Sequence, residues 1–424
     1  MQYKAQFETF LQSVSGEPQN IKDFRKDAFK NFLKIGYPTK RHENWRFTNL
    51  NSLVKTEYRL PNREIGKFDH NLIGNYGVDN CHRIVFINGR FDAKLSTFDH
   101  TTERITIKNT TEIFSDSNQT SIKNDADPFI LLNKAFVSGG YYIEIDSNYT
   151  EAKPLHILNI IYDEKGNSQN HHFNLIKVGD NSQVSIIEEN VNISQKDLFK
   201  NTVYKISVDE NSTLSHILLQ KDHTKSKNLN HIFVDQQDNS TYSTQMINIG
   251  GKLVRNEINV QINGENCDTD ISGLSLLSGN NHVDNYVIVT HDKPNSSSRQ
   301  LFKYILDESS EGVFNGLVTV QPDAQKTDSQ QTNKNILLSK NALMNSNPQL
   351  EIYADDVKCS HGSATGELDE DAIFYLRSRG IDLLAAKSLL IEGFAKEVID
   401  KIKIDSIKEK LSAKLFKWLD QLNG

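Results

Sequence analysis

The sequence predicts a mainly β protein whose core is a stacked β-solenoid between two α-helical regions. From about residue 80 to residue 355, short apolar alternations such as YYIEID, HFNLIKV, YKISV and NYVIVTH follow one another, separated by Gly, Asn, Asp and Ser. Strands joined by close turns, without helices between them, indicate an all-β region. More than ten strands in succession suit a solenoid, in which each coil adds a few short strands. No strict period is visible, so a β-sandwich stays open as the alternative.

The chain divides into three predicted regions. Residues 1–75 form an N-terminal helical region, residues 76–366 the β core, and residues 367–424 a C-terminal helical region. In the first region, Phe24, Ala28, Phe32 and Ile35 recur at helical spacing, and Gly36 ends that helix. An aromatic and basic stretch, RHENWRFTNL, follows it.

The C-terminal region predicts three helices. Asp369 caps the first, Arg377 and Arg379 lie in its last turn, and Gly380 supplies the left-handed stop. The second and third carry apolar stripes, made of Leu390, Ile391, Phe394, Ala395, Val398 and Ile402, and of Ile407, Leu411, Leu415, Trp418, Leu419 and Leu422. Such stripes either pack on each other and on the β core or form an exposed face for a partner, and the pattern leaves both open.

Composition narrows the function. The 424 residues include 48 basic and 55 acidic side chains, a net charge of −7, and no basic run with interleaved aromatic residues, so we expect no nucleic-acid partner. Three widely spaced cysteines suit a reducing cytoplasm. The N-terminus lacks the apolar stretch of a signal peptide, and no apolar run is long enough for a membrane span. We therefore expect a cytoplasmic protein without membrane contact.

The sequence lacks the usual signatures of an enzyme. The IGGKL segment has neither the upstream glycine nor the Ser or Thr of a phosphate loop, so we expect no nucleotide on this chain. No GxGxxG, GxSxG or HExxH motif occurs, and the carboxylates are scattered. We predict that the chain is not an enzyme. A rival hypothesis is a β-helix enzyme that cleaves polysaccharides. Such enzymes gather charged groups in one groove and are usually secreted, whereas the carboxylates here are scattered and the N-terminus lacks the apolar stretch of a signal peptide, so this hypothesis is disfavoured.

Cys359 and His361 are the candidate metal ligands, in the stretch YADDVKCSHGSATG. Side chains alternate along a strand, so the two share one face and lie about 7 Å apart. The even-numbered residues of LEIYA, among them Leu350 and Ala354, are apolar, so we expect the odd face with Cys359 and His361 to point out of the core. Val357 on that face suggests that another chain covers it.

Two ligands do not complete a metal site, because zinc or a cluster iron takes about four. The alternatives are a buried structural cysteine beside a hydrogen-bonded histidine and, with less support, a Cys–His catalytic pair. His291 is a second, weaker candidate, since loop histidines are usually solvated or structural. Cys81 and Cys267 have no local context and are predicted to be structural thiols.

The last third of the chain resembles a known family. The segments SSRQLFKYILDESSEGVFNGLVTV, AQKTDSQQTNKNILLS and PQLEIYADDVKCSHGSATGELDEDAIFYLRSRGI are similar to the core of the SufB/SufD family, scaffolds of the SUF system of iron–sulfur cluster assembly. The match is dense over residues 285–381 and looser from about residue 80. RHENWRFTNL and the chain length resemble the SufD branch, with the SufB branch as the alternative. One departure is HGSATG, where many members have HGATVG, but both glycines remain.

The resemblance implies a right-handed parallel β-helix and a complex with SufB and the ATPase SufC. SufB would pair through the last β-helix strands, SufC would dock on the C-terminal helices, and ATP would be handled by SufC. The resemblance also implies that iron or a transient iron–sulfur cluster is held at the SufB interface, with His361 as a ligand and Cys359 as a ligand or a neighbour. Alone, the chain could form a homodimer through the same edge. A purely structural subunit is the remaining alternative.

Overall fold

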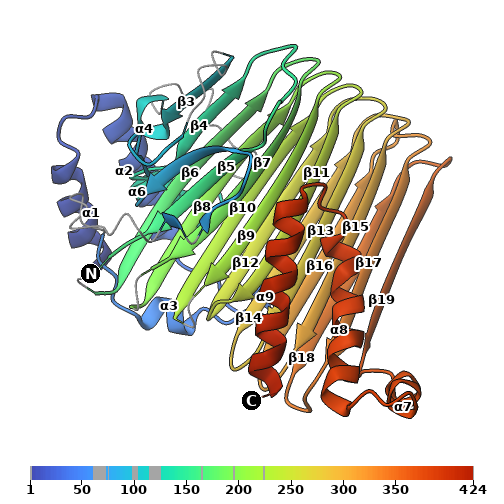
Figure 1. The fold of residues 1–424 in the computed structure, drawn as a ribbon. Coiled ribbons are helices and arrows are strands. Elements are labelled where there is room, and N and C mark those ends of the chain that lie inside the picture. Colours follow the sequence, from blue (N-terminus) through green and yellow to red (C-terminus); the bar gives the residue numbers. More distant parts are fainter. Residues whose placement is uncertain are drawn as a thin grey trace.

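The protein is a parallel β-solenoid with helices on both flat sides (Figure 1). The computed structural model describes residues 2–60, 73–74, 76–97, 104–113, 126–163, 166–193, 196–222 and 225–423. The chain alternates between two sheets, so that each long strand pairs in parallel with the strand two places further along the sequence. This arrangement confirms the predicted mainly β solenoid and excludes the sandwich.

Each sheet is a continuous stack of strands. Sheet A contains β3 (Ile105–Asn109), β4 (Tyr141–Ile145), β6 (Ser168–Val178), β8 (Leu198–Val208), β10 (Ser226–Gln236), β12 (Leu253–Ile262), β14 (His282–His291), β16 (Glu311–Val320) and β18 (Leu343–Ile352). Sheet B contains β2 (Arg90–Phe91), β1 (His82–Ile87), β5 (Leu155–Ile161), β7 (Gln183–Asn192), β9 (Thr213–Asp222), β11 (Thr241–Gly250), β13 (Asp268–Leu277), β15 (Ser297–Leu306), β17 (Asp328–Leu337) and β19 (Lys358–Gly366).

One corner of the coil repeats an asparagine in the left-handed conformation. Positive φ angles of about the same size recur at Asn181, Asn211, Asn239, Asn266 and Asn295. Asparagine tolerates this conformation better than most residues, so it makes a tight corner between two strands. The spacing of 27 to 30 residues between these asparagines is the coil period that the apolar pattern did not reveal. Each coil also has two strands of about ten residues, longer than the short strands expected from the sequence.

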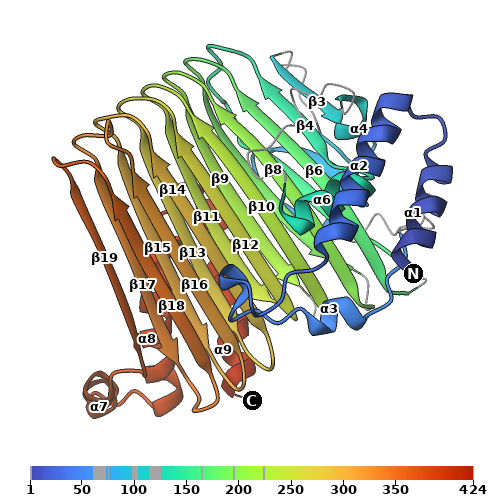
Figure 2. The same ribbon diagram turned by 180° about the vertical axis from the view of Figure 1, so that it is seen from behind.

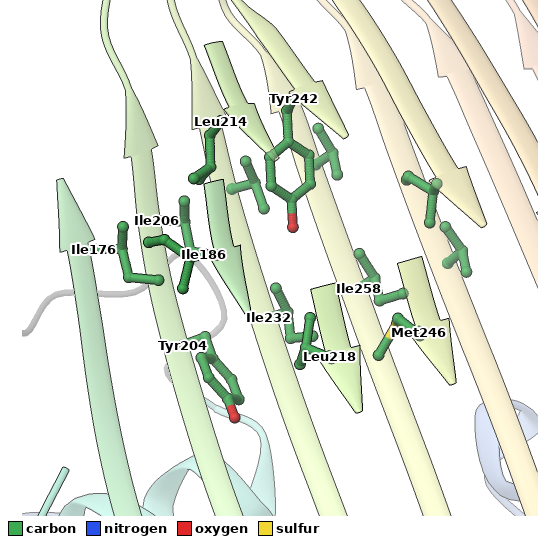
Figure 3. Close-up of a cluster of buried hydrophobic side chains, with 14 of the residues drawn as sticks. Ile176, Ile186, Tyr204, Ile206, Leu214, Leu218, Ile232, Tyr242, Met246 and Ile258 are labelled. Atoms are coloured by element: carbon green, nitrogen blue, oxygen red, sulfur yellow. The ribbon is translucent and has the colours of Figure 1, made fainter. Parts of the chain in front are cut away.

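The space between the two sheets is filled mainly by apolar side chains. Alternate residues of each strand point inward, as in Ile186 of β7, Leu218 of β9 and Ile258 of β12 (Figure 3). These residues are fully or almost fully buried and contact one another along the whole stack. Because burying one such side chain contributes about 1.5–3 kcal/mol, this interior is the main source of stability.

The N-terminal helices cover the outer face of sheet A (Figure 2). They are α1 (Gln2–Ser13), α2 (Gln19–Ile35), η1 (Glu43–Trp45) and α3 (Asn51–Lys55), together with α4 (Thr110–Ile113) and α6 (Pro128–Phe136). The last two lie within the region predicted to have no helices between its strands, so that part of the prediction is wrong. The predicted helix over the Phe24 to Phe32 stripe is confirmed as α2, and Gly36 ends it with a φ of 71°. Ile35, predicted on the buried stripe, is exposed at the end of that helix.

The C-terminal helices are α7 (Glu370–Ser378), α8 (Leu383–Ile399) and α9 (Asp405–Asn423). The predicted start and stop of α7 are confirmed: Asp369 accepts hydrogen bonds from the backbone of Asp371 and Ala372, and Gly380 has a φ of 85°. The apolar stripes of α8 and α9 pack on the outer face of sheet B, against residues such as Ile217 and Leu274 (Figure 1). Leu390 is half-buried and is not part of this cluster, and the side chain of Leu422 lies outside the described residues. The other members of the two stripes are core and do not form an exposed docking face.

Leu411 tests this packing. It is 3% exposed and lies in the cluster that joins α9 to sheet B. Leu411→Ala is expected to lower the free energy of unfolding by about 2–5 kcal/mol, because a cavity is left where the side chain was. Urea unfolding measures this, with Phe416→Ala on the exposed face of the same helix as the control. Equal effects of the two changes would contradict the packing.

Among the residues that the structure describes, no helix is long and apolar enough to cross a membrane.

Candidate functional site

The candidate site lies where the solenoid ends. β18 is the last strand of sheet A and β19 the last strand of sheet B, and each is paired on one side only (Figure 1). In the part of the chain that the structure describes, no strand pairs with their other edges and no further coil lies over the interior at this end. An unprotected edge of this kind is a template for pairing with another chain.

Cys359 and His361 share one face of β19, as predicted, but that face points inward. Cys359 is in register with Ser329 of β17, and His361 with Gln331. Both partners lie on the inner face of β17, where they are 1% exposed, and Cys359 itself packs against the interior cluster. The prediction that the two side chains point out of the core is therefore wrong.

The error comes from the turn between the last two strands. Leu350 and Ala354 contact the interior cluster, as predicted for the even face. However, β18 ends at Ile352 and β19 starts only at Lys358, so alternation does not carry over from one strand to the next. Val357, which suggested a covering chain, also packs against the interior cluster.

The two side chains form the last layer of the interior, and they differ in exposure. Cys359 is half-buried and His361 is exposed. Burial raises the pKa of the Cys359 thiol, a backbone hydrogen bond from Ser329 opposes this, and the charge of Asp328 adds to the rise. The thiol is thus protonated at neutral pH until a metal or a partner changes its surroundings. No hydrogen bond joins the side chain of His361 to another residue in the described part of the chain, while its backbone lies in the ladder with β17.

At the open end, the described residues alone supply too few ligands for a metal ion. No group of three or more His, Cys, Asp or Glu side chains in the described residues is arranged to hold one. A thiol and an imidazole are nevertheless the donor types that zinc, iron and iron–sulfur clusters accept. Because Cys359 and His361 lie at an open end, a second chain placed there could add the missing ligands.

The layer beneath the site is polar, which the sequence analysis missed. Four of the five inward residues of β17 are Ser329, Gln331, Asn333 and Asn335, and they are nearly or fully buried. The amide of Asn335 donates to Asn333 at 2.7 Å and to Thr365 at 2.9 Å. The alternate polar residues of DSQQTNKNIL were the signal, since a buried strand usually places apolar residues there.

The other sequence candidates lie elsewhere. His291 is the last residue of β14 and is fully buried, rather than in a loop as expected; its Nε2 lies 2.9 Å from the hydroxyl of Ser298, and burial lowers its pKa to about 4. Cys267 is buried at a corner of the interior. Cys81 is half-buried, and its thiol donates to the carbonyl of Val78 at 3.0 Å. None of the three reaches the open end.

A second candidate surface lies on α7 and the start of α8. Phe374 and Tyr375 are 75% and 57% exposed, and Leu383, Leu384 and Leu389 are exposed beside them. Leu384 also lines a cavity of about 290 Å³ between these helices and the end of β17. Neighbouring exposed apolar residues of this size mark interaction surfaces in soluble proteins.

Comparison with known proteins gives the family. The SUF system FeS cluster assembly, SufBD core domain model matches residues 160–394, and the SufBD protein N-terminal region model matches residues 1–157. The chain is 31% identical over 386 residues to the iron–sulfur cluster assembly protein SufD of Escherichia coli, covering 90% of this chain and 89% of that protein. It is 31% identical over 415 residues to an iron–sulfur cluster assembly SufBD family protein of Synechocystis, covering 94% and 91%. The chloroplastic protein ABCI7 of Arabidopsis thaliana is 36% identical over 237 residues, 55% of this chain and 50% of that protein. The chain therefore belongs to the SufB/SufD family of the SUF iron–sulfur cluster assembly system.

Proposed function

We propose that this chain is the SufD-type subunit of a SUF complex, and that with SufB and the ATPase SufC it supports iron acquisition and cluster assembly at its open end. Iron and the nascent cluster are cargo here, and the chain is a scaffold without a reaction of its own. The similarity to E. coli SufD over nine-tenths of both chains favours SufD over the SufB branch. We propose a cytoplasmic location, because the three cysteines of this chain are free thiols, as expected in a reducing compartment.

The observation that carries the proposal is the position of an incomplete donor pair at an unpaired end. Cys359 and His361 lie on the inward face of β19, in the last layer of the interior. β18 and β19 are each paired along one edge only, so their other backbone edges are free. We propose that SufB extends the two sheets by strand pairing and brings further ligands over the mouth of the solenoid. Without SufB, the same edges would support a homodimer.

We propose that SufC binds the exposed apolar residues of α7 and the start of α8. Only three residues, 367–369, separate the end of β19 from the start of α7. A movement of α7 that follows ATP binding to SufC would therefore act directly on the strand that carries Cys359 and His361. The rest of the C-terminal region would stay in place, because Lys401 of the α8–α9 turn pairs with Asp270 at 2.6 Å and α9 packs on sheet B.

Replacing His361 tests this function. The His361→Ala chain, co-expressed with SufB and SufC and isolated without oxygen, is expected to form the complex but to lose most of its bound iron and acid-labile sulfide. His361→Gln keeps the size of the side chain and guards against loss of assembly. Ser360→Ala, on the opposite face of the same strand, is the control. Cys359→Ser shows whether the thiol is a ligand or a neighbour.

Intact complexes of both His361 variants with normal iron and sulfide would contradict the ligand role and leave the chain as a structural subunit. Loss of iron in the Ser360→Ala complex as well would mean that the strand edge, rather than the imidazole, is what matters.

A further inference from the structure

The edge strand β18 carries exposed apolar residues at both of its ends. Among the described residues from β1 to β19, the exposed large hydrophobic side chains are those of Leu343, Ile352 and Tyr353. Leu343 is the first residue of β18, Ile352 is its last, and Tyr353 follows directly. All three therefore lie in the last coil. Exposed apolar residues that gather in one place mark an interaction surface, and on the β core that place is the open end.

The corner position that Tyr353 occupies is polar in the preceding coils. The residues that follow β8, β10, β12, β14 and β16 are Asp209, Gln237, Asn263, Asp292 and Gln321. Each donates its backbone N–H to the end of the sheet A strand one coil earlier, as Tyr353 does to Val320 at 2.9 Å. The corner thus forms without an aromatic ring. Because the Tyr353 ring is 61% exposed, folding of the chain does not explain why it is there.

Leu343 and Ile352 also differ from the residues beneath them. Leu343 is in register with Glu311, a charged residue at an exposed position of the preceding coil. Ile352 is in register with Val320, which is fully buried, whereas Ile352 is 40% exposed because no strand beyond β18 covers it in the described chain. A strand added to β18 would cover Ile352 and pass beside the other two side chains.

The free edge of β18 is interrupted at its middle. The backbone N–H groups of Leu343 and Tyr353 donate to carbonyl oxygens of the preceding coil at 3.0 and 2.9 Å. Odd-numbered residues of β18 therefore turn their N–H groups to β16, and even-numbered residues turn theirs to the free edge. Pro348 is even-numbered and has no N–H, so the edge lacks a donor there. With the central hydrogen bond missing, contacts at the two ends must specify more of the register.

We infer that Leu343 and Tyr353 fix the register of the strand that pairs with β18: a strand of the partner subunit, apolar at both ends, lies along this edge and buries both side chains. The two residues are roughly 33 Å apart along the strand, so such a partner buries both in one register only. This role rests on the proposed function, because it needs a partner strand at the edge, but it does not need iron.

Pro348 favours a different chain over a second copy as the partner. Two copies related by a twofold axis would pair β18 with β18 in antiparallel orientation. Placing Leu343 of one protomer opposite Tyr353 of its partner then brings the two Pro348 residues opposite each other, and both hydrogen bonds of the central pair are lost. A partner strand without proline at that place keeps one of the two. In the proposed complex, this partner is SufB.

The test is the affinity of the full chain for full-length SufB, measured by a binding titration. Tyr353→Ala is expected to weaken binding about 30-fold, the effect of removing an aromatic contact from an interface, and Leu343→Ala about tenfold. Tyr353→Phe keeps the ring and is expected to bind like the wild type. Gln321→Ala, at the same corner one coil earlier, and Phe416→Ala, an exposed ring on α9, are the controls and are expected to leave the affinity unchanged.

Pro348→Val tests the choice of partner. It restores both central hydrogen bonds in a pair of identical copies, so it is expected to tighten self-association of the chain alone about 30-fold, the net effect of two hydrogen bonds. Sedimentation equilibrium of the chain without SufB measures this. Unchanged self-association would overturn the preference for a different chain.

Bound iron and sulfide separate the register contacts from the proposed function. Tyr353→Ala complexes assembled at high concentration are expected to hold normal iron and sulfide, because the ring is not a ligand. Normal affinity of both alanine variants for SufB, or equal weakening by Gln321→Ala, would overturn the register contacts and leave the iron site standing. Normal iron in His361→Ala, with weak binding by Tyr353→Ala, would overturn the ligand role alone. Absence of wild-type binding to SufB would overturn both.

Discussion

Replacing Asp284 with alanine is expected to lower the free energy of unfolding by about 3–5 kcal/mol, since it leaves a buried cation without its main partner. Arg255 is 1% exposed on the outer face of sheet A, where it pairs with Asp284 and, at 3.4 Å, with Glu257. The ring of Trp45 covers the guanidinium at 4.1 Å, and the hydroxyl of Thr48 donates to Asp284 at 2.5 Å. The Asp284 carboxylate thus joins the N-terminal segment to the solenoid, so its removal would loosen the segment and the solenoid together.

Urea unfolding measures the loss, with Asp323→Ala in an exposed turn as the control that should change stability by less than about 0.5 kcal/mol. The chain has two tryptophans, so a Trp418→Phe background leaves Trp45 as the only indole. Its emission should shift to longer wavelength in Asp284→Ala before global unfolding, because the ring loses its cover. An unchanged midpoint and unchanged emission would show that the pair is not needed for docking the segment.

Much of the fold could be predicted because it depends on local pattern. Turn residues between apolar alternations predicted the stack of strands, and the cap at Asp369 and the stop at Gly380 predicted α7. The coil period could also have been found, because asparagine followed by serine recurs at Asn181, Asn211 and Asn239. The apolar pattern hid this period, since loops of different length follow each second strand.

The candidate site could be predicted only in part. The sequence identified Cys359 and His361 and placed them on one face, but the turn before β19 decided which face it was. Which buried polar groups pair with each other could not be predicted from the sequence, because the partners can be far apart along the chain. Thr48 and Asp284, for example, are 236 positions apart. The register that places Gln331 under His361 likewise depends on the length of a whole coil, 30 residues here, which no local pattern gives.

Acid is expected to unfold the protein well above the range in which carboxylates usually titrate. Burial lowers the pKa of His171 and His172 to about 3, with the charge of Lys200 also acting on His172, and lowers that of His291 to about 4, all from a usual value of 6.5. The unfolded chain therefore takes up these protons first. Stability is complete above pH 6.5 and is lost as the pH falls from 6.5 toward 3–4, by roughly 4 kcal/mol per pH unit for three groups.

Between pH 7 and pH 4.5 these three histidines alone would remove on the order of 7 kcal/mol, comparable with the whole stability of many domains. Urea unfolding at half-unit steps of pH measures the slope. His291→Gln should lower it by about a third, because one of three titrating groups is gone, whereas His42→Gln, at an exposed position, should leave it unchanged. Glu188 adds a second loss of stability at lower pH. Burial alone would raise the pKa of its carboxyl group, but His216, 3.6 Å away, and the hydroxyl of Tyr204 hold it at about 2. Its contribution to stability is therefore present above pH 4.5 and disappears only as the pH falls toward 2. A stability that stays level down to pH 5 would contradict the prediction, because it would mean that the buried rings are already protonated in the folded chain or reach water without unfolding.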